Sequence, residues 1–68
     1  MALSDNLRQF RQQKKLTLEE VAKSANVTRQ SMNKYEEGQM IPNGIALVRI
    51  AKKLGVTAEE LVDGRNKN

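Results

Sequence analysis

The chain has 68 residues, of which 12 are Lys or Arg and 8 are Asp or Glu, so its net charge is +4 and its pI is about 9.8. It has no cysteine and no histidine, which excludes disulfides, thiolate metal sites and the usual general base near neutral pH. We therefore expect no metal and no cofactor. The basic charge favours a polyanion as partner, although it also serves solubility.

No apolar run reaches transmembrane length, and the N-terminus lacks the basic-then-apolar layout of a signal peptide. We therefore expect a cytoplasmic protein without a membrane partner, and we expect no small-molecule ligand. The length is that of one domain. Because a core this small is marginal, every apolar helix face has to be used.

Apolar residues recur at helical spacing, and no stretch alternates as a strand would, so the sequence predicts an all-α fold. The first helix is predicted over Ser4–Lys14. Ser4 or Asp5 is expected to cap its N-terminus. Its apolar side is marked by Leu3, Leu7 and Phe10.

The second helix is predicted over Leu18–Ala25 and starts with a capping box at Thr17–Glu20. Asn26 is expected to end it, because asparagine tolerates the left-handed conformation better than other non-glycine residues. Thr28 then caps the third helix, Arg29–Glu37, after a very short connection. Two short helices joined by so tight a turn form a helix-turn-helix.

Two further helices complete the predicted compact five-helix bundle. The fourth is predicted over Ile45–Leu54, and the fifth starts with a second capping box at Thr57–Glu60. Three side chains of the fifth helix are expected to face inward: Ala58, Leu61 and Val62. We expect one domain over residues 1–64 and a frayed tail at residues 65–68.

One stripe of the third helix carries an unusual set of polar side chains: Arg29, Gln30, Asn33 and Lys34. A solvated helix usually mixes Glu with Lys to form local pairs. This stripe instead combines a guanidinium, two amides and an ammonium. Such a set calls for an explanation beyond solubility.

The sequence resembles lambda-repressor/Cro-type helix-turn-helix regulators, also called the xenobiotic-response-element family, over residues 17–42, TLEEVAKSANVTRQSMNKYEEGQMIP. Ala22 is small where the two helices would cross, and Asn26 stands in the turn. The likeness extends to Phe10-Arg11 and to residues 50–61, IAKKLGVTAEEL. The resemblance implies a compact bundle of five helices whose members usually bind double-stranded operator DNA as two-fold dimers.

The resemblance also implies that the third helix enters the major groove with its N-terminal part against base edges. Arg29 and Gln30 match family positions on the first turn and would pair with guanine and adenine, while Asn33 and Lys34 would reach adjacent bases. The alternative interpretation is a solvated face that contacts nothing. Five further side chains are expected at phosphates, or else as ordinary caps and loop polar groups: Thr17, Thr28, Ser31, Gln39 and Asn43.

Two other sets of residues are singled out, the first by the resemblance and the second by the apolar residues that the predicted core leaves over. Arg11 in the first helix is expected to pair with Glu36 late in the third and so to brace the recognition helix, as is common in the family. The alternative interpretation is two independent surface charges. Four apolar side chains outside the predicted core suggest a dimer surface, or else are scattered surface hydrophobes: Ile41, Ile45, Val48 and Val62. Pairing there would set two recognition helices about 34 Å apart, one DNA turn.

Two functions remain open. The first is a sequence-specific transcriptional regulator, a repressor on a palindromic operator as a homodimer or an activator of the controller type. The second is an antitoxin-like module whose DNA binding depends on a protein partner. Leu18 and Glu37 favour the second slightly, since the family often has glutamine at the first position and basic or amide groups near the other. An enzyme is not expected. Glu residues that stand next to each other in the sequence point in different directions around a helix, so they do not converge on a pocket.

Overall fold

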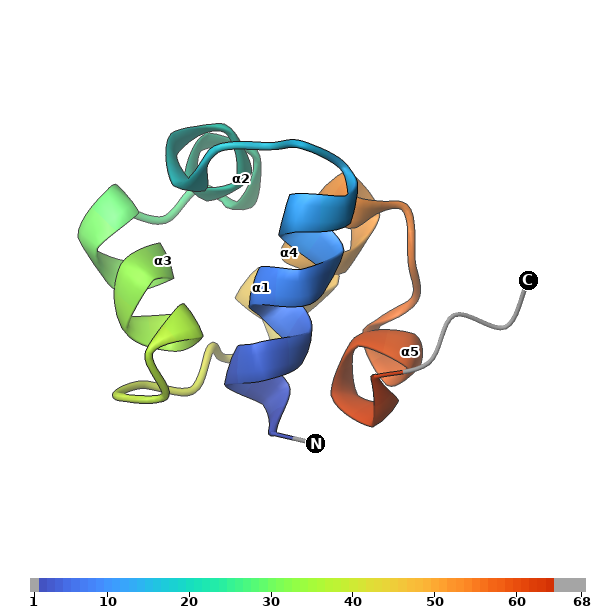
Figure 1. Cartoon of the computed structure of the whole chain (residues 1–68). Helices are drawn as coiled ribbons and strands as arrows, with labels where there is room; N and C mark the ends of the chain where they lie inside the picture. Colours follow the sequence, from blue (N-terminus) through green and yellow to red (C-terminus); the bar gives the residue numbers. More distant parts are fainter. Residues whose placement is uncertain (1, 65–68) are drawn as a thin grey trace.

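The computed structural model describes residues 2–64, which form five helices and no strand (Figure 1). The helices are α1 (Leu3–Gln13), α2 (Leu18–Ala25), α3 (Arg29–Glu36), α4 (Gly44–Leu54) and α5 (Ala58–Asp63). α2 packs on α3 and α4, α1 packs on α3 and α5, and α4 packs on α5. The predicted all-α bundle is therefore confirmed, while the tail at residues 65–68 lies outside the described residues. No helix in the described part is long and apolar enough to cross a membrane.

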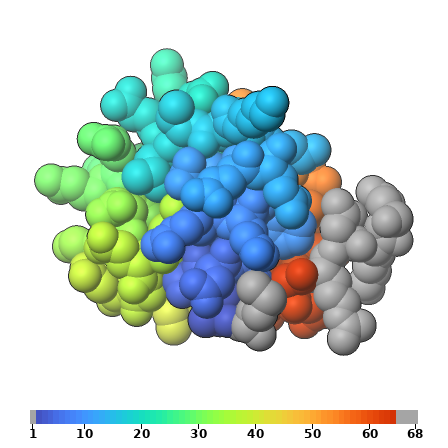
Figure 2. All heavy atoms as spheres, in the orientation of Figure 1, coloured from blue at the N-terminus to red at the C-terminus, as the bar shows by residue number. Residues whose placement is uncertain are grey.

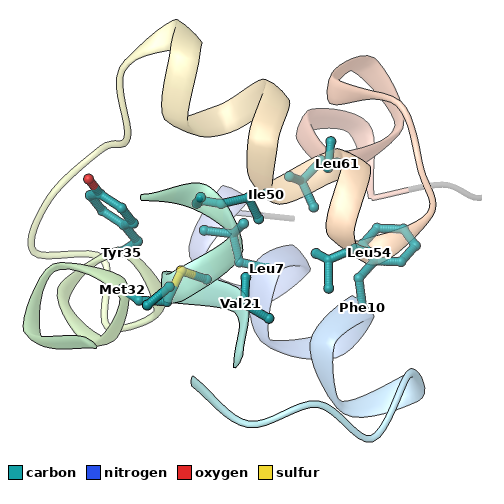
Figure 3. Close-up of a cluster of buried hydrophobic side chains, with 11 residues drawn as sticks. Leu7, Phe10, Val21, Met32, Tyr35, Ile50, Leu54 and Leu61 are labelled. Atoms are coloured by element: carbon teal, nitrogen blue, oxygen red, sulfur yellow. The ribbon is translucent and has the colours of Figure 1, made fainter. Parts of the chain in front are cut away.

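All five helices contribute to one cluster of buried apolar side chains (Figure 3). Its larger members are Leu7, Phe10, Val21, Met32, Tyr35, Ile50, Leu54 and Leu61. The buried alanines Ala22, Ala25 and Ala51 leave room for the helices to approach closely. A domain of this size buries a smaller fraction of its surface than larger ones do, so a domain with this one cluster as its core is only marginally stable.

The helix-turn-helix is closed by local hydrogen bonds that the sequence predicted. The Thr17 hydroxyl accepts the Glu20 backbone N–H at 3.1 Å, and the Glu20 carboxylate accepts the Thr17 N–H at 2.9 Å. Asn26 adopts the left-handed conformation with φ 59° and ψ 42°, and Thr28 caps α3. The short connection between α2 and α3 is thus confirmed.

The start of α1 differs from the prediction. The helix begins at Leu3, its N-cap is Ala2, and no side chain caps it, so the predicted cap at Ser4 or Asp5 is wrong. Leu3 packs against the buried cluster, and this contact extends the helix upstream of both polar residues. Tertiary packing therefore outweighs the local capping preference at this end.

Three other helix ends shift by one residue. α1 ends at Gln13, because the chain turns through Lys15 at a φ of 57°. α3 ends at Glu36, since Gly38 takes a φ of 76° soon afterwards. α4 starts at Gly44 because the Asn43 side chain accepts a backbone N–H of its first turn.

The inward face of α5 also differs from the prediction. Leu61 is fully buried, but Val62 is 49% exposed, so the expectation that Val62 faces inward is wrong. The side chain of Asn6 in α1 is buried and donates to the carbonyl oxygens of Leu61 and Val62 at 2.9 and 3.1 Å. In a six-residue helix anchored in this way, Leu61 and the buried Glu60 take the inner face, and Val62 points outward.

Candidate nucleic-acid interface

α3 buries one face and presents the opposite one to solvent. Met32, Tyr35 and Glu36 are buried, at the spacing of neighbouring helical turns. The exposed face holds the four side chains that were predicted to read bases: Arg29, Gln30, Asn33 and Lys34. In Figure 2, α3 lies at the edge of the visible face, next to α1 and α2. The amphipathic spacing of α3 therefore directs these four side chains away from the core.

Three of these four side chains share one hollow. Arg29, Gln30 and Asn33 line a space of about 210 Å³ together with Leu18 of α2. Leu18 and Arg29 also line a wider, open hollow of about 520 Å³ that reaches the end of α1. Lys34 is exposed but lines neither of them. The structure thus brings together a guanidinium and two amides at the start of α3.

The N-terminus of α3 is electropositive, whereas acidic side chains offset the partial positive charge at the N-terminus of α2. The first turn of α3 carries no acidic residue and begins with Arg29. The first turn of α2 carries Glu19 and Glu20. Because unpaired N–H groups at a helix start bear partial positive charge, α3 offers the better site for an anionic group.

The five side chains predicted at phosphates are mostly engaged in capping. The hydroxyls of Thr17 and Thr28 and the side-chain oxygen of Asn43 each accept a backbone N–H of the helix that follows. The Thr28 hydroxyl donates to Ser31 Oγ at 2.9 Å, so the Ser31 hydroxyl keeps its own hydrogen for another acceptor. Gln39 is exposed in the loop after α3. Capping still leaves a donor on Thr17, Ser31 and Asn43.

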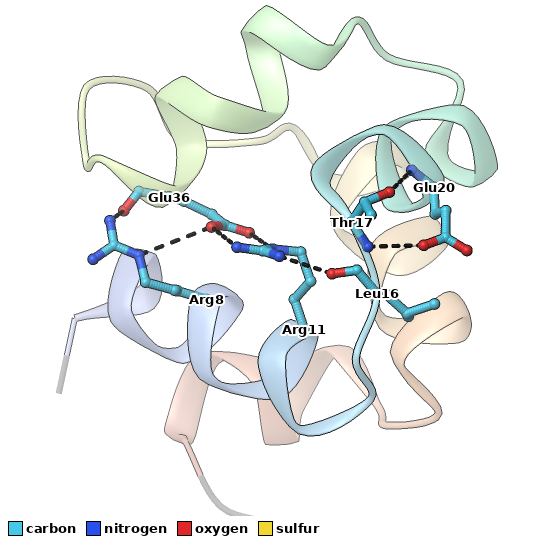
Figure 4. A network of polar contacts seen from close by, with 6 residues as sticks. All are labelled: Arg8, Arg11, Leu16, Thr17, Glu20 and Glu36. Carbon is cyan, nitrogen blue, oxygen red and sulfur yellow. Dashed lines mark hydrogen bonds and ion pairs between the residues drawn. The ribbon is translucent and has the colours of Figure 1, made fainter.

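The Glu36 carboxylate lies against the guanidinium of Arg11 (Figure 4). Arg11 Nε and Nη2 donate to its two oxygens at 2.6 and 3.0 Å, so the predicted pair is present as a two-bond contact. Arg11 Nη1 also donates to the carbonyl oxygen of Leu16 at 2.8 Å. The hydrogen bond to Glu36 raises the pKa of Arg11 above its ordinary value. One guanidinium therefore ties α3 to α1 and to the segment leading into α2.

Sequence reasoning missed the contact that Arg8 makes. Arg8 Nη2 donates to the backbone carbonyl oxygen of Glu36 at 3.0 Å, and its Nε lies 3.9 Å from the Glu36 carboxylate. Arg8 and Arg11 stand three residues apart, on one face of α1, which is the signal that could have suggested a shared partner.

Among residues 2–64, no three His, Cys, Asp or Glu side chains gather closely enough to hold a metal ion.

The side chains predicted for a dimer surface are all exposed. Ile41 is 83% exposed, Ile45 67% and Val48 51%, and Val62 is also open to solvent. Ile45 and Val48 stand one turn apart on α4. Met40 adds a further exposed apolar side chain next to Ile41. Exposed apolar groups mark an association surface where they form one contiguous patch.

Comparison with known proteins agrees with this fold. A family model described as helix-turn-helix matches residues 7–61. The HTH-type transcriptional activator BcrR of Enterococcus faecalis is 38% identical over 64 residues, which cover 94% of this chain and 31% of that protein. The uncharacterized HTH-type transcriptional regulator YqaE of Bacillus subtilis (strain 168) is 35% identical over 63 residues, which cover 93% of this chain and 54% of that protein. The chain therefore spans 31% of one of these curated relatives and 54% of the other.

A solved structure has the same architecture. The P22 c2 repressor protein, crystallised in complex with synthetic operator 9T, matches with a TM-score of 0.89 at 22% identity. The match covers 96% of this chain and 98% of that one. At this identity, the likeness concerns the fold. The matching family model and both relatives show that the chain belongs to the lambda-repressor/Cro-like (XRE-type) helix-turn-helix family, a family of transcription regulators and not an enzyme class.

Proposed function

We propose that this chain binds DNA sequence-specifically and regulates transcription, with α3 in the major groove. The observation that carries the proposal is the shared hollow of Arg29, Gln30 and Asn33 at the start of α3. A guanidinium matches guanine O6 and N7, and an amide matches adenine N6 and N7, so these groups suit base edges. Lys34, one residue beyond Asn33, reaches an adjacent base.

Phosphate contacts set the position of α3 in the groove. They come from the donors that capping leaves unused on Thr17, Ser31 and Asn43, from Gln39, and from the start of α3 at Thr28. The net charge of +4 supports attraction to the DNA backbone. These contacts supply affinity, and the side chains in the hollow supply preference for sequence.

The chain acts as a homodimer on a palindromic operator. The exposed apolar side chains of α4, of the preceding loop and of α5 support this part of the proposal. A two-fold pair sets its two α3 helices about 34 Å apart and so matches two half-sites one DNA turn apart. Repression is the proposed mode of action, since occupying an operator needs only a DNA-binding domain. Activation is the alternative mode, since the 38% identical relative BcrR is an activator.

A second candidate is an antitoxin-like module whose DNA binding depends on a protein partner. Two features favour it. Leu18 stands at the start of α2, where it cannot donate to phosphate, and Glu37 is exposed at the end of α3, where it repels phosphate. Both features weaken backbone contacts that a DNA-binding domain acting alone relies on.

The experiment that tests the proposal is selection from random duplex DNA by the purified chain at about physiological salt. We expect an enriched inverted repeat whose half-site centres lie about one helical turn apart. Sedimentation of the chain with one selected duplex should show two chains per site. Binding that is uniformly weak, strongly salt-dependent and without an enriched sequence would favour the partner-dependent module.

A further inference from the structure

We propose that Leu18 is a specificity-determining residue that contacts the 5-methyl group of a thymine in each half-site. The inference rests on the proposed function of α3, because it requires the shared hollow to face the major groove. Leu18 belongs to α2 and cannot donate a hydrogen bond to a phosphate, so this contact gives it a different role.

Leu18 lies between the core and the hollow at the start of α3. Leu18 is the first residue of α2, directly after its N-cap Thr17. Its side chain packs against the buried cluster and is only partly covered. The uncovered part lines the hollow formed with Arg29, Gln30 and Asn33, and it is the apolar member among the described residues there. An apolar group thus stands directly beside the three side chains proposed to read bases.

The chemistry of the major groove carries the second step. Guanine, adenine and cytosine present hydrogen-bonding groups at that edge, whereas thymine adds a methyl group. Leu18 neither donates nor accepts a hydrogen bond. The thymine methyl is therefore the group at these base edges that Leu18 contacts best. Their contact removes apolar surface of both the methyl group and the leucine side chain from water. Since Leu18 lies beside Arg29 and Gln30, that thymine is expected next to the guanine or adenine that they bind.

The contact discriminates between bases without adding a hydrogen bond. Burial of one methyl group corresponds to roughly fourfold in affinity, so a two-fold dimer gains about fifteenfold from two such contacts. A leucine that only fills space between α2 and α3 would stabilise the fold but would leave affinity independent of the thymine methyl. Dependence on that methyl group is therefore the property that separates the two roles.

The test replaces each thymine of a selected operator in turn by deoxyuridine, which removes the methyl group and keeps the hydrogen-bonding pattern. With the parent chain, we expect one position per half-site at which binding weakens about fourfold. In Leu18→Ala, that dependence should vanish. Leu47→Ala is the matched control, because Leu47 is also a partly buried leucine packed against the cluster. It should keep the full thymine dependence.

Leu18→Gln provides a second variant should Leu18→Ala fold poorly, since the family often has glutamine at this position, and it too should lose the dependence. The inference is overturned if no deoxyuridine weakens binding by the parent, or if Leu18→Ala or folded Leu18→Gln keeps the dependence. If Arg29→Ala loses the operator preference, but no deoxyuridine weakens binding by the parent, only the role of Leu18 is overturned. The proposed role of α3 then stands. Failure of the parent to select any sequence would overturn the proposed function as well.

Discussion

Glu36→Gln replaces the carboxylate that holds the end of α3 against α1 by an amide of nearly the same shape. The parent side chain is 4% exposed and accepts hydrogen bonds from Arg11 Nε and Nη2 at 2.6 and 3.0 Å. The amide retains one acceptor oxygen, but its NH₂ group then faces a guanidinium donor. The substitution also removes the negative charge beside Arg11, which stays protonated.

The size of the effect follows from these contacts. Loss of one charge-assisted hydrogen bond costs about 1.5–3 kcal/mol. The Arg11 side chain is 16% exposed and keeps its bond to the Leu16 carbonyl, which offsets part of the cost of losing its counter-charge. We therefore expect a loss of about 2 kcal/mol for Glu36→Gln. Glu36→Ala removes both acceptors and should lose about 3 kcal/mol, a large share of the stability of so small a domain.

Urea unfolding followed by far-UV circular dichroism measures this loss. Glu37→Gln is the matched control, since Glu37 is exposed, and its stability should stay within about 0.5 kcal/mol of the parent. Replacing both Arg11 and Glu36 by Met should give a more stable chain than Glu36→Gln, because no buried charge is left alone. A loss below about 0.5 kcal/mol in Glu36→Gln would refute the role assigned to this pair, because exposed pairs contribute that little.

Three further predictions test the turn, the capping box and the dimer. Asn26→Ala should lose about 1 kcal/mol in urea unfolding because of its left-handed conformation, whereas Asn26→Gly should stay close to the parent. The hydrogen bond from the Thr17 backbone N–H is the main cause that lowers the pKa of Glu20, so the stabilisation by this carboxylate is complete above the unfolded pKa near 4.5 and is lost as pH falls through the folded pKa. The stability advantage of the parent over Glu20→Gln should therefore shrink on acidification below that pH, and a constant advantage would contradict it. Ile45→Asp should shift the chain to monomer in sedimentation and weaken operator binding while keeping the parental circular dichroism spectrum; an unchanged dimer would exclude Ile45 from the interface.

The helix-turn-helix could be predicted from the sequence because its signals act locally. The capping box of Thr17 and Glu20, the turn at Asn26 and the cap at Thr28 each involve residues no more than five positions apart. The stripe of α3 follows equally directly from helical spacing. The Arg11–Glu36 pair joins residues 25 positions apart, and its prediction came from the family resemblance instead.

The features that the sequence did not reveal depend on where neighbouring helices lie. The start of α1 is set by packing of Leu3, and the buried Asn6 is held by the last carbonyls of α5. Asn6 lies three residues after Leu3 and four before Phe10, so its place on the apolar face was a usable signal. The outward direction of Val62 and the place of Leu18 in the shared hollow both require the tertiary arrangement.

The most direct test of the central claim, that α3 reads DNA sequence, is a parallel selection from random duplex DNA with the parent and Arg29→Ala. Lys23→Ala, which removes an exposed cation from α2, is the control for lost charge. We expect Arg29→Ala to lose preference at one position of each half-site, by about 1–3 kcal/mol, and to keep the preference at the other positions. Lys23→Ala should keep the whole motif. A full parental motif selected by Arg29→Ala would contradict the placement of α3 in the major groove.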